Sequence, residues 1–401
     1  MTTPLDDVTI ADFSQMQQGG WATQKLGDMG ADVIKIEPAG GELVRTAPIE
    51  GALLEDTSPY FLAMNRNKRS ITLDLKSDEG RQIAEGIIDE ADALVENFRP
   101  GVMEKFGLGY EDVKEINNSI VYVSASGFGS DGPYADRPGQ DILAQAMSGL
   151  VQNTGRKQDP PTPAGSFICD AHSANTIALH TVVALYHQQL TGEGQKIETN
   201  LLNAGIDFQT QEITSAINMD AKAERSESGI GHVYSGAPYG VYETEDGYVA
   251  LSFANLPSIA TELGIEPLCD YADSREVYVN RDEIKHQLED ETQEIPTEDL
   301  MDRLLNAGAW VAEVNDYTEA ANHPQVRHND MIIELEYPGI GTFETTGVPV
   351  SMSNASLEFT DPPTPGEQTD EILDELGYDE DEIQTLEENG ITAKEGSARS
   401  Q

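Results

Sequence analysis

The sequence predicts an α/β protein built around a parallel sheet. Two observations predict this class: apolar segments with strand character alternate with amphipathic helical segments over the first two hundred residues, and glycine-rich or polar turns separate them. Strands that are separated by helices of this length pair in parallel, because each crossover returns the chain to the same edge of the sheet. We therefore expect a layered α/β domain in the first half of the chain.

The elements of this domain are expected in a fixed order. Residues 8–14 (VTIADFS) form a buried strand, a Gly-Gly turn follows, and a helix over residues 21–30 stops at Gly30. Further strands are expected over residues 31–38, 69–75, 93–98 and 120–129, with a helix over residues 79–91. A long helix then begins at about residue 172 and ends within residues 191–194.

The character of the sequence changes after about residue 225. Residues 236–253 indicate a hairpin around the turn Glu245-Asp246-Gly247, and an acidic, helix-rich stretch follows to about residue 325. The remainder contains strand and turn patterns, a proline-rich crossing and an acidic helix over residues 369–377. We expect a large domain over residues 1–224, a smaller one over 225–325 and a C-terminal segment over 326–401.

The charge balance limits the possible partners. The 401 residues contain 72 Asp and Glu against 24 Lys and Arg, a net charge of −48 that is spread over the whole length. Nucleic-acid binding is excluded, since phosphates need a basic face. A uniform acidic surface is typical of a protein kept in concentrated salt, where the Debye length falls to ~3 Å. Two cysteines without a disulfide framework, and no apolar run long enough for a membrane, complete the expectation of a halophile's cytoplasmic protein with no membrane contact.

Several apparent motifs have simpler explanations. GFGSDG at residues 127–132 matches the dinucleotide fingerprint, but PYADRPG follows with two prolines, so we expect a loop and no nicotinamide site. His172, His180 and His187 are spaced too widely for a metal pair, and we expect no metal. Cys169 is interpreted as a small buried hydrophobe, and no GxSxG nucleophile elbow occurs.

Asp170 stands apart from the other acidic residues. In GSFICDAHSAN (165–175) it follows an apolar pair and precedes small residues at the start of the long helix. It can be a helix N-cap, since Asp accepts hydrogen bonds from the first N–H groups of a helix. It can also be a covalent nucleophile exposed in a cleft. The residues alone leave both interpretations open.

Nine segments together resemble the class III CoA-transferase family, which contains formyl-CoA and carnitine CoA-transferases. They are residues 12–42, 67–80, 96–108, 124–149, the segment around Asp170, 190–202, 237–251, 322–332 and 366–378. This resemblance implies a Rossmann-like large domain built from both ends of the chain, with residues 326–401 returning to it, and a smaller α+β domain. It also implies an interlocked homodimer, with coenzyme A bound as acyl-CoA.

The resemblance places Asp170 at the family's nucleophile position and Gln17 beside the reacting carboxylate. Asp170 would attack an acyl-CoA to give a mixed anhydride and then an aspartyl-CoA thioester, from which a free acid takes the CoA. Covalent catalysis divides one difficult exchange into several balanced steps. N–H groups at the helix start after Asp170 and a side-chain amide are expected to stabilise the tetrahedral intermediates. Gln17 can equally be a polar turn residue.

Family position also implies a set of residues that bind CoA. They are Arg45, Leu75, Lys76, Asn97, Phe98, Lys105 and Arg137. Basic side chains would contact the phosphates, and Asn97 and Phe98 would line the adenine side. Pro38 stands where some relatives have arginine, which puts one phosphate contact in doubt. Each Lys or Arg can also be an ordinary surface charge.

Two other functions remain open. The resemblance extends to α-methylacyl-CoA racemases, but their pattern has a histidine where this chain has Gln140, and an amide cannot transfer protons. A non-catalytic acyl-CoA-binding module is the third alternative. For the transferase we expect a dicarboxylate pair such as succinyl-CoA and mesaconate, by analogy. His232 and Tyr234 are expected to contact the second carboxylate, although a packed turn would also explain them.

Overall fold

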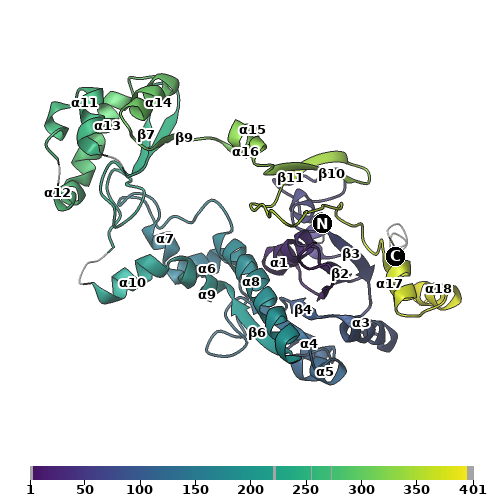
Figure 1. Cartoon of the computed structure of the whole chain (residues 1–401). Coiled ribbons are helices and arrows are strands. Elements are labelled where there is room, and N and C mark those ends of the chain that lie inside the picture. The colour runs from purple at the N-terminus through teal and green to yellow at the C-terminus, as the bar shows by residue number, and fades with distance from the viewer. Residues whose placement is uncertain (1–2, 220–222, 254, 272, 395–401) are drawn as a thin grey trace. The chain divides into compact units, whose positions relative to one another are not determined.

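The structure is a computed structural model that describes residues 3–219, 223–253, 255–271 and 273–394 (Figure 1). The chain forms two compact units. Unit 1 contains residues 1–144, 167–208 and 324–401, and unit 2 contains residues 145–166 and 209–323. The second unit therefore takes in two segments that lie outside the expected range 225–325.

Unit 1 is built on a six-stranded sheet with the order β3-β2-β1-β4-β5-β6. Its strands are β1 (Thr9–Asp12), β2 (Asp32–Glu37), β3 (Lys68–Thr72), β4 (Ala93–Glu96), β5 (Val121–Ser126) and β6 (Gln195–Asn200). Every neighbouring pair is parallel. The predicted α/β class with a parallel sheet is confirmed.

Helices cover both faces of this sheet. Those of unit 1 and its boundary are α1 (Met16–Asp28), α2 (Pro59–Leu62), α3 (Asp78–Glu90), α4 (Val102–Lys105), α5 (Tyr110–Ile116), α6 (Asp141–Ser148), α8 (Ile168–Thr191), α9 (Leu201–Phe208), α16 (Pro324–His328), α17 (Thr369–Glu375) and α18 (Glu380–Glu388), with a 3-10 turn at Leu43–Thr46. Alternate strand residues enter two cores: Ile10 packs with α1 and α8, whereas Ala11 packs with α3 and α17. Figure 1 shows this layering around the sheet.

The turn expected at Gly19-Gly20 is wrong, because both residues lie inside α1. A side chain at Gly19 would collide with the side chain of Ser14, which lies in the connection from β1. Gly19 therefore allows the helix to approach the connection from β1 closely. Packing of the α1 backbone outweighs the low helix propensity of glycine.

The C-terminal segment of unit 1 adds an antiparallel hairpin of β10 (Ile332–Tyr337) and β11 (Gly341–Thr346). The predicted acidic helix is present as α17, whose Ile372 and Leu373 are buried in the core beneath the sheet. No helix in the described part of the chain combines the length and hydropathy needed to cross a bilayer.

Unit 2 contains a small antiparallel sheet of β7 (Gly240–Glu243), β8 (Tyr248–Leu251) and β9 (Val311–Glu313). Its helices are α7 (Leu150–Asn153), α10 (Thr210–Asn218), α11 (Leu256–Leu263), α12 (Ser274–Val279), α13 (Arg281–Thr292), α14 (Thr297–Asn306) and α15 (Tyr317–Asn322), with a 3-10 turn at Glu266–Leu268. The predicted hairpin is β7–β8. Its turn residue Asp246 accepts a hydrogen bond from the Thr297 N–H at 2.8 Å.

Candidate active site

Asp170 lies in the first turn of α8, in a cavity of about 380 Å³ within unit 1. The cavity is at the carboxyl ends of β1, β4 and β5, where the strand order reverses between β1 and β4. Open α/β sheets bind ligands at such a switch point. The described lining residues are Met16, Gln18, Tyr60, Asn97, Phe98, Arg99, Pro100, Ser126, Gly127, Ala135, Arg137, Pro138, Gly139, Gln140, Asp141, Ile142, Phe167, Asp170 and Leu201.

The N-cap interpretation of Asp170 is wrong, because α8 begins earlier than the sequence pattern indicates. The helix starts at Ile168 with Phe167 as its N-cap residue, so Asp170 already has helical backbone. Instead Asp141 satisfies the first turn: its Oδ1 accepts hydrogen bonds from the N–H groups of Cys169 at 2.7 Å and Asp170 at 3.1 Å. Within the described chain, the carboxylate of Asp170 itself makes no hydrogen bond.

The environment of Asp170 favours its protonated form. Burial in the cavity, with a smaller contribution from the negative charge of Asp141, raises the pKa of Asp170 to about 7. A buried carboxylate that is not stabilised by hydrogen bonds is costly in a fold, and such groups are frequent at functional sites.

The helix start does not offer the N–H donors that we expected for a tetrahedral intermediate. Asp141 occupies the N–H groups of Cys169 and Asp170, and the Ala171 N–H donates to the Phe167 carbonyl at 3.0 Å. Any oxyanion donor must therefore come from another element that lines the cavity.

Tyr60, in the first turn of α2, lines the cavity with a hydroxyl group, and the sequence patterns did not identify it. Its hydroxyl donates to Oε1 of Gln17 at 3.4 Å, and burial together with the charge of Asp170 raises the pKa of Tyr60 well above its usual value. Gln17 is buried, and the cavity lining in the described chain contains its neighbour Gln18 instead. The Gln18 amide donates to the Ser173 hydroxyl at 2.9 Å, which joins α1 to α8.

Two loops that carry the remaining polar lining touch one another. Gly127 follows β5 and Gly139 precedes α6, and a Cβ atom on either glycine would collide with the backbone of the other. The segment between them begins no helix, as we predicted for GFGSDG. The contact sets the position of the following Gln140 and Asp141, which both line the cavity.

The structure brings together three of the residues expected to bind CoA. Asn97, Phe98 and Arg137 line the cavity, with Arg99 as a further cation that the sequence analysis did not single out. The amide of Asn97 is occupied by the backbone of Gln15, accepting from its N–H at 2.8 Å and donating to its carbonyl at 2.7 Å. The guanidinium of Arg137 lies 3.6 Å from the centre of the Tyr134 ring.

Four expected CoA residues lie outside this lining in the described chain. Lys76 and Lys105 are exposed, and Leu75 packs against the hydrophobic core. Arg45 is only 4% exposed. Its Nε donates to Glu37 at 2.8 Å, its Nη1 donates to the Pro363 carbonyl at 2.8 Å, and its guanidinium stacks on Phe61. These contacts give Arg45 a role inside the fold.

Cys169 has the buried position that we predicted. Its side chain is fully buried against Ala144 and Leu201, and burial with the nearby carboxylates raises the pKa of its thiol to about 12. The thiol therefore stays protonated and unreactive. The histidines of α8 do not form a metal site with other residues in the described chain, and His172 is paired with Asp207 at 2.8 Å.

Unit 2 has a cavity of its own, of about 770 Å³, which contains His232 and Tyr234. His232 Nε2 lies 2.6 Å from Glu212 Oε1, and its Nδ1 accepts a hydrogen bond from the Tyr234 N–H at 3.2 Å. The Tyr234 hydroxyl is buried and has no hydrogen-bond partner within the described residues. Of the two residues, Tyr234 is the one with a free polar group.

Comparison with known proteins gives the family. The profile of CoA-transferase family III matches residues 5–369. The chain belongs to this family. It is 32% identical to the succinyl-CoA:mesaconate CoA-transferase of Haloarcula hispanica over 93% of this chain and 96% of the relative. It is also 32% identical to the human succinyl-CoA:glutarate CoA-transferase, over 97% of this chain and 90% of the relative.

A solved structure agrees with this class III CoA-transferase fold. The CAIB/BAIF family protein from Brucella suis is 31% identical and superposes with a TM-score of 0.83, covering 94% of this chain and 100% of the other. The class III transferase is thus an enzyme whose substrates are CoA thioesters, and its mixed α/β fold carries Asp170 at the switch point of the sheet.

Proposed function

We propose that this enzyme transfers CoA from an acyl-CoA donor to a free carboxylic acid through a covalent intermediate on Asp170. The observation that carries the proposal is the state of this carboxylate. It is partly buried in a cavity, it makes no hydrogen bond in the described chain, and its pKa is raised to about 7. A carboxylate with little solvation is a stronger nucleophile than one in water.

The reaction begins when a carboxylate oxygen of Asp170 attacks the thioester carbonyl carbon. The tetrahedral oxyanion collapses, the carbon–sulfur bond breaks, and CoA leaves as a thiolate while a mixed anhydride remains on Asp170. The thiolate then attacks the Asp170 carbonyl carbon and releases the donor acid as its carboxylate. The acceptor carboxylate attacks the resulting aspartyl-CoA thioester, which releases the CoA thiolate and forms a second mixed anhydride. The thiolate then attacks the acceptor's carbonyl carbon in this anhydride, which gives the new acyl-CoA and returns Asp170 to its carboxylate form.

Two neighbouring groups support these steps. The hydroxyl of Tyr60 stays protonated because its pKa is raised, and its hydrogen bond to Gln17 Oε1 is long at 3.4 Å, so we propose that it turns from Gln17 to donate to the oxyanion. Gln17 would act through its contact with that hydroxyl. The buried cavity limits access of water, which would otherwise hydrolyse the anhydride. For CoA itself we propose Phe98, Arg99 and Arg137 as contacts within the lining, with the exposed Lys76 and Lys105 reaching the phosphates.

The proposed substrates are dicarboxylates, with succinyl-CoA as donor and mesaconate or a similar C4–C5 acid as acceptor. The support is the similarity to succinyl-CoA:mesaconate and succinyl-CoA:glutarate CoA-transferases. His232 and Tyr234 remain proposed contacts of the second carboxylate. Replacing Tyr234 with Phe tests this directly, through the KM of the acceptor acid.

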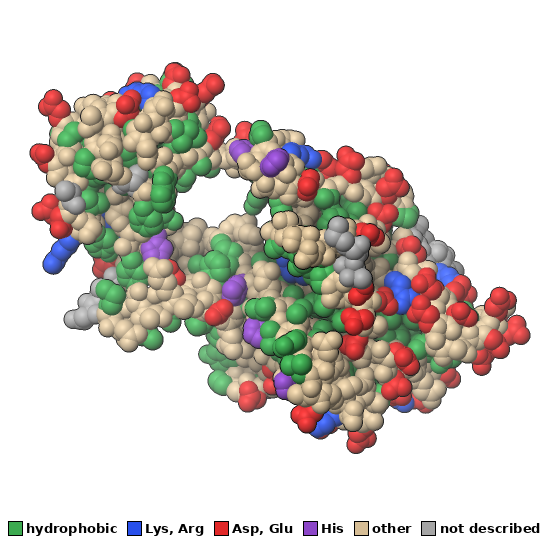
Figure 2. Space-filling model, in the orientation of Figure 1, with side chains coloured by type: hydrophobic (Ala, Val, Ile, Leu, Met, Phe, Trp, Pro, Cys, Tyr) green, Lys and Arg blue, Asp and Glu red, His purple; other side chains and the backbone are tan. Residues whose placement is uncertain are grey.

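We further propose that the enzyme is a homodimer in the cytoplasm of a halophile. The support for a dimer is a stripe on α8, the exposed side chains Leu179, Val183, Tyr186 and Leu190, in a helix whose only Asp, Glu, Lys or Arg is Asp170. Figure 2 shows hydrophobic side chains on the surface in the region where Figure 1 draws α8. The support for a saline cytoplasm is the net charge of −48.

Covalent trapping tests the proposed mechanism. The enzyme is mixed with succinyl-CoA in concentrated salt, treated with hydroxylamine or borohydride, and digested for peptide mass spectrometry. We expect a modification confined to the peptide that contains Asp170. The modification should be lost in Asp170→Asn. It should still form in the matched variant Asp141→Asn. Unmodified Asp170 with several donors would exclude the mechanism.

A proton-exchange assay separates the transferase from a racemase. Incubation of a 2-methylacyl-CoA in D₂O would give deuterium at the α-carbon only if the enzyme has an acid/base pair there. Gln140 lines the cavity at the position where racemases have a histidine, and its amide cannot exchange protons. We expect no deuterium incorporation. CoA binding without transfer or exchange would indicate a binding module.

A further inference from the structure

The connection from β1 to α1 is held in an unusual conformation at the edge of the cavity. Met16, which lines the cavity beside Gln18, has a φ angle of +59°. L-amino acids with side chains rarely adopt this left-handed conformation. Where such a residue persists at a functional site, the surrounding structure must hold it in place.

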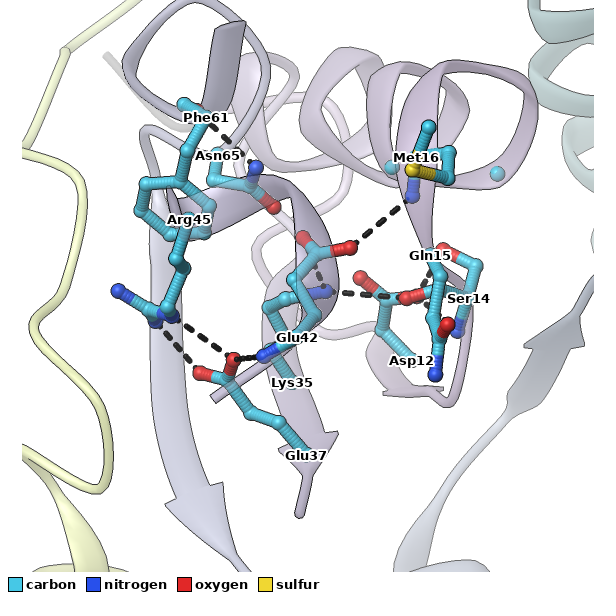
Figure 3. A network of polar contacts seen from close by, with 12 residues as sticks. Asp12, Ser14, Gln15, Met16, Lys35, Glu37, Glu42, Arg45, Phe61 and Asn65 are labelled. Carbon is cyan, nitrogen blue, oxygen red and sulfur yellow. Dashed lines mark hydrogen bonds and ion pairs between the residues drawn. The ribbon is translucent and has the colours of Figure 1, made fainter. Parts of the chain in front are cut away.

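Glu42 makes the contact that holds Met16. Its Oε2 accepts a hydrogen bond from the Met16 N–H at 2.9 Å, and its other oxygen, Oε1, lies 3.1 Å from Lys35 Nζ. Lys35 in turn donates to the Ser14 carbonyl at 3.0 Å. One buried ion pair therefore binds the connection at two points, Ser14 and Met16, as Figure 3 shows.

The ion pair is shielded from water, and Glu37 holds the backbone of Glu42 in place. The side chains of Lys35 and Glu42 are each 1% exposed. The Glu42 N–H donates to Glu37 Oε2 at 2.8 Å, and Glu37 is bound by Arg45. Burial lowers the pKa of Lys35, but Glu42, Asp12 and Glu37 outweigh it and hold that pKa above its usual value. Lys35 is therefore charged, and a charged donor and acceptor make the stronger hydrogen bonds.

The residues at this start of α1 contact the cavity wall and the elements around Asp170. Gln17 contacts the Tyr60 hydroxyl, Gln18 joins α1 to α8 through Ser173, and Met16 forms part of the cavity wall. These three residues follow one another in the chain, so a shift at Met16 moves all of them. Glu42 is not part of the cavity lining in the described chain, and its one hydrogen bond to a lining residue is the one from the Met16 N–H. Its charge also helps to raise the pKa of Tyr60, after burial and Asp170, so the rate alone does not separate the two effects and the exchange of residues 13–18 reports the positioning.

We infer that Glu42 is a positioning residue for the CoA transfer, which holds the Ser14–Gln18 connection so that Gln17, Gln18 and Tyr60 face Asp170. The inference rests on the proposed function of Asp170. It gives Arg45 a part in the reaction different from the phosphate contact expected from the sequence: Arg45 fixes Glu37, which fixes the backbone of Glu42.

A control is available in a second buried ion pair of the same unit. Asp28 binds Arg66 at 2.7 Å, with both side chains 3% exposed, so it matches Glu42 in burial and charge. It lies at the other end of α1 and has no contact with the Ser14–Gln18 connection in the described chain. A general loss of a buried charge therefore affects both residues, whereas a loss of positioning affects only Glu42.

The test compares Glu42→Leu, Glu42→Gln and Asp28→Asn in concentrated salt by two measurements. The first is the single-turnover rate of adduct formation on Asp170 at saturating succinyl-CoA, with the Kd for CoA measured separately. The second is amide hydrogen exchange of the peptide over residues 13–18. We expect Glu42→Leu to slow adduct formation about 100-fold and to speed exchange at least about tenfold, with Kd within about threefold, since misplaced groups lose rate before binding.

The other variants set the limits of the inference. Glu42→Gln keeps an oxygen for the Met16 N–H but loses the charge that pairs with Lys35, so a loss of about tenfold is expected. Asp28→Asn should keep both the rate and the exchange within about threefold of the wild type, once the folded fraction is corrected.

Three results would overturn the inference: a folded Glu42→Leu with the wild-type rate, wild-type exchange over residues 13–18 in that variant, or an equal loss of rate in Asp28→Asn. If Glu42→Leu does not fold, Glu42→Gln decides, and wild-type values in both measurements would overturn it. If the wild-type enzyme forms no adduct on Asp170, the proposed function fails, and the exchange measurement still tests whether Glu42 holds the connection.

Discussion

Asp170, the proposed nucleophile, and Asp141, which supports the start of α8, lie in the wall of one cavity, and the charge of Asp141 affects how Asp170 responds to pH. Asp141 holds the first turn of α8 by accepting two N–H groups, so it cannot simply be removed. Its charge also raises the pKa of Asp170, after the larger effect of burial. One residue therefore has a structural and an electrostatic effect, which conservative substitution can separate.

The rate of adduct formation should rise with pH around a midpoint of about 7, because the proposed nucleophile is the carboxylate form of Asp170. Asp141→Asn keeps an oxygen for the two N–H groups but removes the charge, so we expect the midpoint to move to lower pH. Single-turnover rates across pH 5–9 measure both. An exposed control such as Asp89→Asn should leave the midpoint unchanged, and an unchanged midpoint in Asp141→Asn would contradict the assigned cause.

Asp170 should also destabilise the fold at neutral and high pH. Its pKa is raised from 3.8 to about 7 in the folded chain, so the folded state binds the proton more tightly, and stability is lost as pH rises from about 4 to about 7. At about 1.4 kcal/mol per pKa unit the loss is at most about 4 kcal/mol. We expect Asp170→Asn to raise the free energy of unfolding at pH 8 by about 1–4 kcal/mol in denaturant titrations, and to match the wild type near pH 4. Equal stabilities at pH 8 would contradict the burial of a charge at Asp170.

Among the elements, strands were easier to predict than helix starts. The strand positions follow from apolar runs, because each strand is buried between two layers of helices. β1, β2, β4 and β5 lie within the predicted ranges, and β3 begins one residue before its range, at Lys68. The start of α8 was placed too late, since its first turn is satisfied by Asp141, a partner 28 residues earlier in sequence that no local pattern reveals. For the same reason Tyr60 was missed, and Arg45 was assigned to CoA although Glu37 holds it.

The backbones of the loops at Gly127 and Gly139 are in close contact, and there is no room for a side chain on either glycine. Gly139→Ala would place a methyl group against the Gly127 backbone and shift Gln140 and Asp141. We expect a loss of about 1–3 kcal/mol of stability and a reduced rate of CoA transfer even in the folded fraction. Thermal unfolding and single-turnover rates measure these effects. Gly40→Ala is the control, since nothing lies within 4 Å of a Cβ atom at that position, and it should change neither stability nor rate. Equal behaviour of the two variants would show that the contact between Gly127 and Gly139 is not required.

For the whole molecule, the proposed dimer requires the α8 stripe to be covered. Leu179, Val183, Tyr186 and Leu190 recur at helical spacing and are 55–67% exposed. Val183→Glu with Leu190→Glu adds like charges to the stripe on both copies, so we expect monomers at micromolar concentration in analytical ultracentrifugation. Val279→Glu, an equally accessible apolar site at 70% exposure on α12, should leave the dimer intact. A dimeric double variant, or a monomeric wild type, would exclude this interface.

The net charge of −48 should make stability depend on salt. Acidic side chains are scattered over the surface drawn in Figure 2, with few basic ones among them, so like charges repel across the folded surface. We expect the unfolding temperature to rise steeply with KCl up to about 1 M and less above it, since the Debye length has fallen to ~3 Å by then.

The salt dependence of stability should arise from exposed charges and not from the buried ion pairs. Lys35–Glu42 and Asp28–Arg66 are 3% exposed or less and are poorly screened, so salt acts on the surface charges and leaves these pairs in place. Replacing eight exposed Asp and Glu residues of α13, α17 and α18 with their amides should therefore reduce the slope of the unfolding temperature against KCl. Sucrose at equal osmolality is the control for effects of co-solutes on water. An unfolding temperature that responds equally to sucrose and to KCl, in both proteins, would mean that screening of this surface does not stabilise the fold.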